Sequence, residues 1–131
     1  MRAAKIYLII MGIMSVVFGV IYLVDPLSMT NPMGFGALKP SALTDVRATY
    51  GGFQIGTGLF MFWCLRPERL KMGMLLALLS VAAIATSRLI GFALDGDVIP
   101  VLQYTVAFEI ALTLISLVLF LRTPDTPAVA H

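Results

Sequence analysis

The sequence predicts an all-α membrane protein with four transmembrane helices in a compact bundle. Of its 131 residues, 60% are hydrophobic and only 12% are charged, and the mean hydropathy is +0.97. A soluble domain of this size carries about 25% charged residues, so the deficit indicates that lipid is the main solvent. The apolar residues form four runs, each near the roughly 20 residues that a helix needs to cross a bilayer core. These runs lie at about 6–24, 42–65, 72–94 and 98–121.

The first predicted helix follows a basic segment that contains Arg2 and Lys5. A secretory signal begins in the same way, but this apolar run is longer than a signal core and has no small-x-small cleavage site after it. We therefore expect a retained transmembrane helix. Residues 25–40 come next and contain three prolines and two glycines, which argue against a continuous helix. This segment is expected to be an interfacial loop or, alternatively, a lid over the bundle.

The second predicted helix starts after Pro40, with Ser41 as its N-cap, and ends before a basic turn at 66–71. The third ends at an Asp-Gly-Asp sequence, 95–97. The fourth has Pro100 in its first turn, where the missing N–H costs little. All four helices belong to one predicted domain, residues 1–121, and the Pro-containing tail at 122–131 is expected to be disordered.

Basic residues predict the orientation in the membrane. The side that holds both termini carries six of them: Arg2, Lys5, Arg66, Arg69, Lys71 and Arg122. The other side is richer in aspartate. The positive-inside rule therefore places both termini in the cytoplasm, and the expected location is the bacterial inner membrane. Nucleic-acid binding is not expected, because the cations do not form a patch with interleaved aromatic residues.

Charged and amide side chains inside the predicted spans are the candidates for function. Arg88 lies roughly 9 Å below the outer end of the third helix, and Glu109 about 14 to 16 Å below the start of the fourth. Helical side chains lean toward the N-terminus, so these two lean toward each other, and we predict that they form a buried pair. Arg47 leans outward, toward a ligand or toward the acids of the outer loops, Asp45, Asp95 and Asp97.

Helical periodicity assigns faces to the second and fourth helices. Arg47, Gly51, Gln54 and Gly58 share one side of the second helix, and a polar side of the fourth contains Glu109, which together predict a polar interior. The predicted ligand-binding residues are Arg47, Tyr50, Gln54, Arg88 and Glu109. Small residues that allow close helix packing are predicted at Gly52, Gly56 and Gly91.

Three classes of function fit these residues. The preferred one is binding of a small amphiphile or lipid headgroup in an outer-half polar pocket. The alternative is a structural or accessory subunit of a membrane complex, in which the Arg88–Glu109 pair only stabilises the bundle. A third is a membrane enzyme or proton-coupled transporter in which Glu109 is a general acid or base, although no nucleophile or second acid accompanies it.

The expected partners are membrane lipid, a small amphiphilic ligand, and a second copy of the chain or a partner membrane protein. No cofactor and no metal site are expected. The single cysteine, Cys64, excludes an intramolecular disulfide and a Cys-x-x-Cys site, and the single histidine, His131, lies in the tail.

A family resemblance rests on two motifs and one acid. They are Asp45-x-Arg47-Ala48-x-Tyr50-Gly51-Gly52, the segment 87–91 that contains Arg88, and Glu109 in the last helix. The chain resembles a family of small bacterial four-helix membrane proteins classed as a domain of unknown function, in which the first acid is often Glu. It is also loosely similar to DoxX-type four-helix proteins. The resemblance implies the architecture and the importance of these positions, and the second likeness hints at an accessory role beside membrane enzymes.

Overall fold

A computed structural model describes residues 1–96 and 98–125 of the chain. Within these residues the secondary structure is helical and contains no strand, which confirms the all-α prediction. The elements are α1 (Arg2–Val24), α2 (Pro26–Thr30), the 3-10 helix η1 (Asn31–Met33), α3 (Pro40–Val46), the π-helix η2 (Arg47–Gly52), α4 (Phe53–Trp63), the 3-10 helix η3 (Pro67–Arg69), α5 (Leu70–Asp95) and α6 (Pro100–Arg122).

Local sequence signals explain where the long helices begin and end. Pro40 and Pro100 stand in the first turns of α3 and α6, where a missing N–H leaves no hydrogen bond unmade. α5 ends at Gly96, which adopts a left-handed conformation with φ of 69° and donates its N–H to the carbonyl of Phe92. Only glycine takes this conformation without a steric penalty. The boundaries therefore lie close to the predicted ones.

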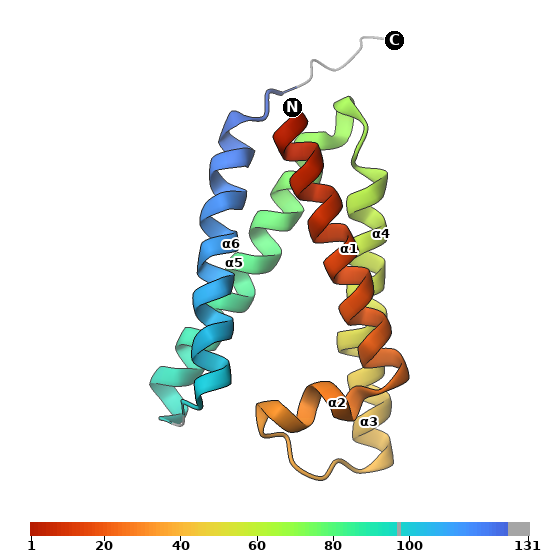
Figure 1. Cartoon of the computed structure of the whole chain (residues 1–131), viewed down its shortest axis with the longest axis vertical. Helices are drawn as coiled ribbons and strands as arrows, with labels where there is room; N and C mark the ends of the chain where they lie inside the picture. The colour runs from red at the N-terminus through yellow and green to blue at the C-terminus, as the bar shows by residue number, and fades with distance from the viewer. Residues whose placement is uncertain (97, 126–131) are drawn as a thin grey trace.

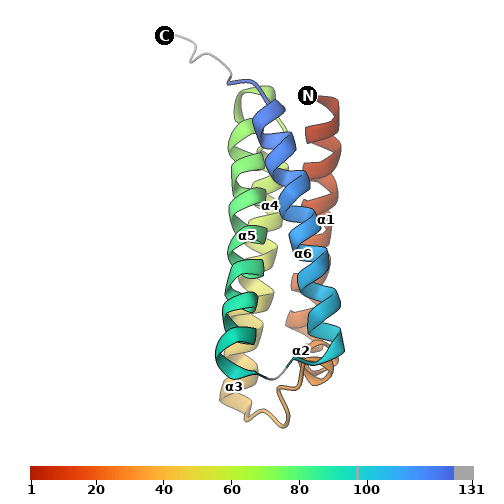
Figure 2. The same ribbon diagram turned by 90° about the vertical axis from the view of Figure 1, so that its left-hand side faces the viewer.

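The long helices form two antiparallel pairs (Figure 1). α1 packs against the continuous helical segment 40–63, which consists of α3, η2 and α4, and α5 packs against α6. The pairs meet at the end where α1 begins and α6 ends, here called the terminal end. They diverge toward the opposite end, here called the loop end, which holds residues 25–40 and the turn after α5 (Figures 1 and 2).

The buried core lies in the terminal half of the bundle. Leu8 of α1, Met61 of α4 and Met74 of α5 are fully buried there, together with Leu70 at the start of α5. The rest of this cluster comprises Ala4, Tyr7, Met11, Cys64, Ala77 and Val81. The main cluster of buried apolar side chains thus lies in the terminal half.

Residues 25–40 are more ordered than a simple loop, because they include α2 and η1. Asp25 caps α2 by accepting a hydrogen bond from the N–H of Ser28, and the buried Thr30 hydroxyl donates to the carbonyl of Pro26. η1 contacts α6. The segment therefore reaches from the end of α1 to the other helix pair at the loop end (Figure 1).

Three helical stretches are long and apolar enough to cross a membrane: Arg2–Val24, Pro67–Asp95 and Pro100–Arg122. The predicted second span corresponds to residues 40–63, which are helical throughout but change from α to π and back. A π-helix has one extra residue per turn, and such segments are frequent at functional sites.

The start of the predicted disordered tail makes defined contacts. Thr123 is buried and donates its hydroxyl to the carbonyl of Leu119. The Lys71 Nζ atom lies 2.6 Å from Asp125 Oδ2. The remainder of the predicted tail, 126–131, falls outside the described residues.

Candidate functional site

Glycine contacts bring α1 and the second helical segment together and so fix the position of Arg47. A Cβ atom at Gly58 would lie 2.7 Å from the carbonyl oxygen of Gly12, and one at Gly19 would lie 2.8 Å from the carbonyl oxygen of Gly51. Real Cβ atoms do not approach other atoms so closely. Small residues at these four positions therefore let two helix backbones touch, as is common in membrane helices.

This contact differs from the predicted one. Nothing lies within 4 Å of a Cβ built at Gly52 or Gly56, and a Cβ at Gly91 would meet only Asp95 of its own helix, at 3.7 Å. Within residues 1–96 and 98–125, none of these three glycines packs closely against another helix. The second helix has two faces with small residues, and either could pack closely against another helix. In the structure, the face with Gly51 and Gly58 meets α1. Packing of a helix from another chain against Gly52 and Gly56 stays a prediction.

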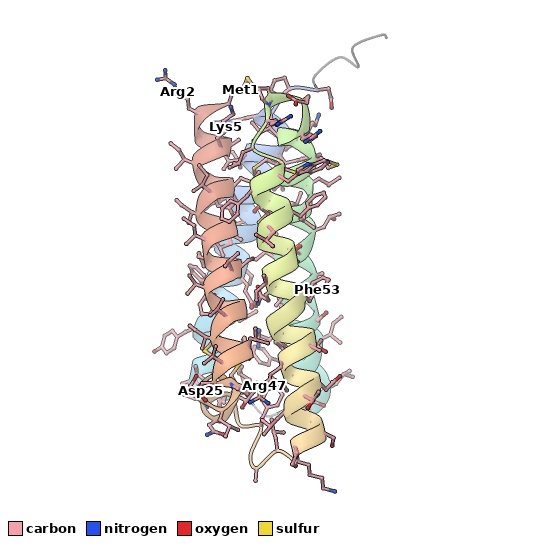
Figure 3. The ribbon with its side chains drawn as sticks, turned by 90° about the vertical axis from the view of Figure 1, so that its right-hand side faces the viewer. Met1, Arg2, Lys5, Asp25, Arg47 and Phe53 are labelled. Carbon is pink, nitrogen blue, oxygen red and sulfur yellow. The ribbon has the colours of Figure 1, made fainter. Side chains whose placement is uncertain are left out.

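Arg47 is the first residue of the π-helix and is held against the end of α1. Its Nε atom donates a hydrogen bond to the carbonyl oxygen of Leu23, 3.1 Å away. Figure 3 shows Arg47 at the loop end, between α1 and the second helical segment. Of the acids predicted as its partners, Asp45 and Asp95 form no ion pair with it, and Asp97 lies outside the described residues.

Arg88 and Glu109 are in direct contact between α5 and α6. The guanidinium Nε donates to Oε2 at 3.1 Å, and Nη2 donates to Oε1 at 3.0 Å. Two parallel hydrogen bonds of this kind are stronger and more directional than a single ionic contact. The Arg88 side chain keeps 23% of its surface exposed and that of Glu109 keeps 11%. The pair lies in the loop half, where the two helix pairs have separated.

The last turn of α1 is in contact with Arg47 and within electrostatic range of Arg88. Leu23 accepts the hydrogen bond from Arg47, and the neighbouring Tyr22 is near enough to Arg88 for an electrostatic interaction. The Tyr22 ring stacks on Tyr50 with centroids 5.3 Å apart. Tyr22 and Leu23 were not among the predicted site residues. The signal in the sequence is the helical spacing of Gly12, Ser15, Gly19 and Tyr22, which places Tyr22 on a face with small residues.

An aromatic cluster closes this side of the site. Phe35, from the 25–40 segment, meets Tyr50 edge to face with centroids 6.5 Å apart. Tyr50 thus contacts both α1 and the connection that follows it, and it remains partly exposed. The sequence does not indicate this contact, because a loop residue has no periodicity that could predict its partner.

Several polar atoms at this site have no partner among residues 1–96 and 98–125. Gln54 makes no hydrogen bond there, and neither the terminal nitrogens of Arg47 nor Nη1 of Arg88 are engaged. No fully buried side-chain nitrogen or oxygen in this part of the chain lacks a partner. The unengaged donors of Arg47, Gln54 and Arg88 are therefore accessible rather than sealed inside the protein.

The comparisons with known proteins identify a family. Residues 3–120 match the family model described as "Domain of unknown function (DUF4345)". The chain belongs to this family. A search of the curated proteins and a search of the solved structures found no similar protein. The family match agrees with the expected uncharacterised family, and the motif and the likeness to DoxX-type proteins stay predictions.

The charges at the site of this DUF4345 protein do not cancel. Arg88 and Glu109 neutralise each other, whereas Arg47 has no carboxylate partner in the described part of the chain. The result is one excess positive charge with accessible N–H donors. Because both oxygens of Glu109 are engaged by Arg88, the arrangement is suited to holding an anion rather than to presenting a free carboxylate to a substrate.

Proposed function

We propose that this DUF4345 protein spans the bacterial inner membrane four times and binds an amphiphile with an anionic headgroup at the loop end. Three stretches already have the length and hydropathy of membrane spans. The fourth proposed span, residues 40–63, is helical throughout. At 1.5 Å per residue it is about 36 Å long, which exceeds a hydrocarbon core of about 30 Å.

The proposed orientation has both termini in the cytoplasm. The start of α1 and the end of α6 lie at the same end of the molecule (Figure 1), as four spans require. The turn between α4 and α5 also lies at that end, and it contributes Arg66, Arg69 and Lys71. This excess of cations supports a cytoplasmic terminal end by the positive-inside rule.

One observation carries the binding proposal: two arginines from different helix pairs keep accessible N–H donors beside the same turn of α1. Arg47 approaches Leu23, and Arg88 lies near Tyr22. An unpaired charge within a membrane-spanning helix costs about 2.5 to 3.5 kcal/mol on insertion scales. An anionic group between the two arginines would offset part of this cost and would use the donors that the protein leaves unengaged.

The position along the helices favours an amphiphile over a soluble anion. Both arginines belong to the loop half, near the level where lipid headgroups meet hydrocarbon, and the helix surfaces between them and the terminal end are apolar. A headgroup at the arginines would leave its hydrocarbon tail alongside these surfaces. The 25–40 segment, with Phe35 against Tyr50 and η1 against α6, lies over this end and is proposed as its lid.

A structural role is the second candidate, and the bidentate Arg88–Glu109 contact favours it. This contact joins α5 to α6, which are already neighbours, so the pair also fixes the register of these two helices. In that reading the protein is an accessory subunit of a membrane complex. A catalytic or proton-carrying role for Glu109 has no comparable observation behind it.

The test uses Arg47→Gln, because this arginine contributes to the proposed site without belonging to the ion pair. We expect wild-type protein purified in mild detergent to retain an amphiphile with an anionic headgroup, detected by native mass spectrometry and identified in an organic extract. A hydrogen bond to a charged group contributes about 1.5 to 3 kcal/mol, so Arg47→Gln should reduce retention roughly tenfold or more.

The matched control is Lys39→Gln, which removes one positive charge from an exposed position at the same end. It should retain the amphiphile as well as wild type does. Equal retention by the Arg47 variant, or equal loss in both variants, would contradict a specific site at Arg47.

A further inference from the structure

An apolar groove lies between α4 and α5, away from the arginine site. It has a volume of about 410 Å³ and is lined by Phe53, Gly56, Thr57 and Phe60 of α4 and by Leu76 of α5. The Thr57 hydroxyl donates to the carbonyl of Phe53 at 2.8 Å, so its polar hydrogen is directed to its own helix. Gly56 contributes no side chain, and nothing lies within 4 Å of a Cβ built there. The groove therefore offers an almost wholly apolar surface.

The groove leads to a cation at the terminal end. From Phe53 to Phe60, α4 advances by about 10 Å toward that end. The Phe60 ring then contacts Trp63, with centroids 5.4 Å apart, and the guanidinium carbon of Arg69 lies 3.8 Å from the centroid of a Trp63 ring. An arginine above a tryptophan face is a favourable cation–π contact. A continuous path of contacts thus runs from the apolar groove to a positive charge.

The charge at the end of this path is not neutralised by the described residues. Arg66 and Arg69 form no ion pair there, although Glu68 stands between them in the sequence. Lys71 differs, because it is paired with Asp125. Trp63 is half exposed, as is typical of tryptophan at the level of lipid headgroups. The site combines an apolar groove, an interfacial aromatic residue and two unpaired cations.

We infer that this groove and the turn above it bind one anionic phospholipid of the leaflet at the terminal end. An acyl chain lies along Phe53, Gly56 and Phe60, and the phosphate is held by Arg66 and Arg69. Basic residues at the end of a membrane helix attract anionic headgroups. A helix from a second copy would fill the groove but would bring no anion to the two arginines. This site is separate from the proposed amphiphile site, which lies at the opposite end.

The experiment is a lipid titration of the full chain in mild non-ionic detergent, followed by native mass spectrometry. Dioleoyl phosphatidylglycerol is compared with dioleoyl phosphatidylcholine, which has the same acyl chains. Each basic residue near an anionic headgroup strengthens binding about fivefold. Arg69→Gln should therefore weaken phosphatidylglycerol binding about fivefold and leave phosphatidylcholine unchanged. The matched control is Arg2→Gln, which removes an exposed cation of α1 at the same end. It should change the binding of neither lipid.

A second pair of variants tests the groove. Gly56→Leu places a side chain in the hollow and should abolish retention of both lipids. Gly52→Leu adds the same side chain one turn away, where a Cβ is equally free of contacts and does not line the groove, so it should retain both. If Gly56→Leu does not fold, Thr57→Leu adds volume to the same groove and replaces it.

Three outcomes would overturn the inference. An equal loss of phosphatidylglycerol binding in Arg2→Gln and Arg69→Gln would indicate general electrostatic attraction of anionic lipid without a specific site. Unchanged phosphatidylglycerol binding in Gly56→Leu would show that the groove holds no acyl chain. A wild-type dimer that Gly56→Leu dissociates, with lipid binding unchanged, would assign the groove to a second copy of the chain.

Discussion

The two helix pairs are held together by different means, although both are antiparallel and apolar. α1 and α4 touch through their backbones at Gly12 and Gly58. α5 and α6 are joined by the bidentate contact of Arg88 with Glu109, and a cavity of about 140 Å³ remains between them. In a bilayer, lipid is as apolar as leucine, so helix association depends on close packing and on polar interactions. The close backbone contact marks the first pair, and the bidentate ion pair marks the second.

This difference bears on where function is expected. A backbone contact consumes no polar group and leaves none accessible, so the α1–α4 interface offers little to a ligand. The ion pair uses two nitrogens of Arg88 and leaves Nη1 accessible. Arg47 is different again, because the close α1 contact places it at the edge of the interface. The accessible nitrogens of both arginines therefore lie in the loop half, outside the backbone contact.

The largest loss of stability is expected from Gly58→Leu, which disrupts the close backbone contact between α1 and α4. Its Cβ would meet the carbonyl oxygen of Gly12 at 2.7 Å and the backbone nitrogen of Val16 at 3.1 Å, and backbone atoms cannot rotate away. Overpacking typically costs 1 to 3 kcal/mol, and this rigid contact should cost more than about 3 kcal/mol. The measurement is helix loss in detergent micelles titrated with sodium dodecyl sulfate, followed by circular dichroism.

Gly56→Leu is the control for that experiment, because the same substitution two residues away meets nothing within 4 Å. Its stability should stay within about 0.5 kcal/mol of wild type, as for an exposed position. If the two leucine variants unfolded together, close packing at Gly58 would not be what holds α1 to α4.

The next largest loss of stability is expected from Glu109→Leu, which removes the ion pair between α5 and α6. It leaves Arg88 without a partner, at a cost of about 2 to 3 kcal/mol. The double variant Arg88→Leu/Glu109→Leu removes both charges and should restore most of that stability, because two apolar groups replace the pair. Unfolding in the same detergent titration measures both.

The double variant also separates the two proposed functions. If it is stable and still retains the anionic amphiphile, the pair is structural and Arg88 does not belong to the binding site. If it is stable and retains no amphiphile, the accessible Arg88 nitrogen contributes to binding. A double variant less stable than Glu109→Leu alone would contradict the expectation that the lone charge causes the loss.

The sequence allows the helices to be predicted better than their contacts. Long apolar runs, together with proline at the starts of α3 and α6 and glycine after α5, give helix positions that lie near the observed ones. Side-chain direction brings Arg88 and Glu109 toward each other, and the structure has the two in contact. Both inferences use only local geometry, which periodicity describes well.

Other features depend on information that periodicity lacks. Gly51 and Gly52 are adjacent in the sequence, and nothing in their spacing says which one meets α1. The π-helix at Arg47–Gly52 is a local change of helix type that a period of 3.6 does not predict. The assignment of Arg47, Gly51 and Gly58 to one face likewise does not say that this face meets the backbone of α1. Tertiary contact decides each of these points.

The smallest loss of stability is expected from removal of the hydrogen bonds that join one helix pair to the other. The Tyr7 hydroxyl of α1 lies 2.7 Å from Ser116 Oγ and 3.1 Å from the carbonyl oxygen of Leu112, both in α6. Tyr7 and Ser116 are buried within the terminal half. Tyr7→Phe should lower the free energy of unfolding by about 1 kcal/mol, the net contribution of one hydrogen bond. Tyr104→Phe is the control, because Tyr104 is 78% exposed and its hydroxyl makes no hydrogen bond to the described residues.

Ser116→Ala and the double variant complete a mutant cycle, whose coupling energy isolates the contact between the two hydroxyl groups. A coupling of about 0.5 kcal/mol or more would show that a polar contact supplements the apolar core between the pairs. A coupling near zero would mean that apolar packing around Leu8 and Met74 alone holds the pairs at the terminal end. In that case the polar side-chain contacts between long helices in the described residues would contribute only at the loop end, where Arg47 contacts Leu23 and Arg88 contacts Glu109.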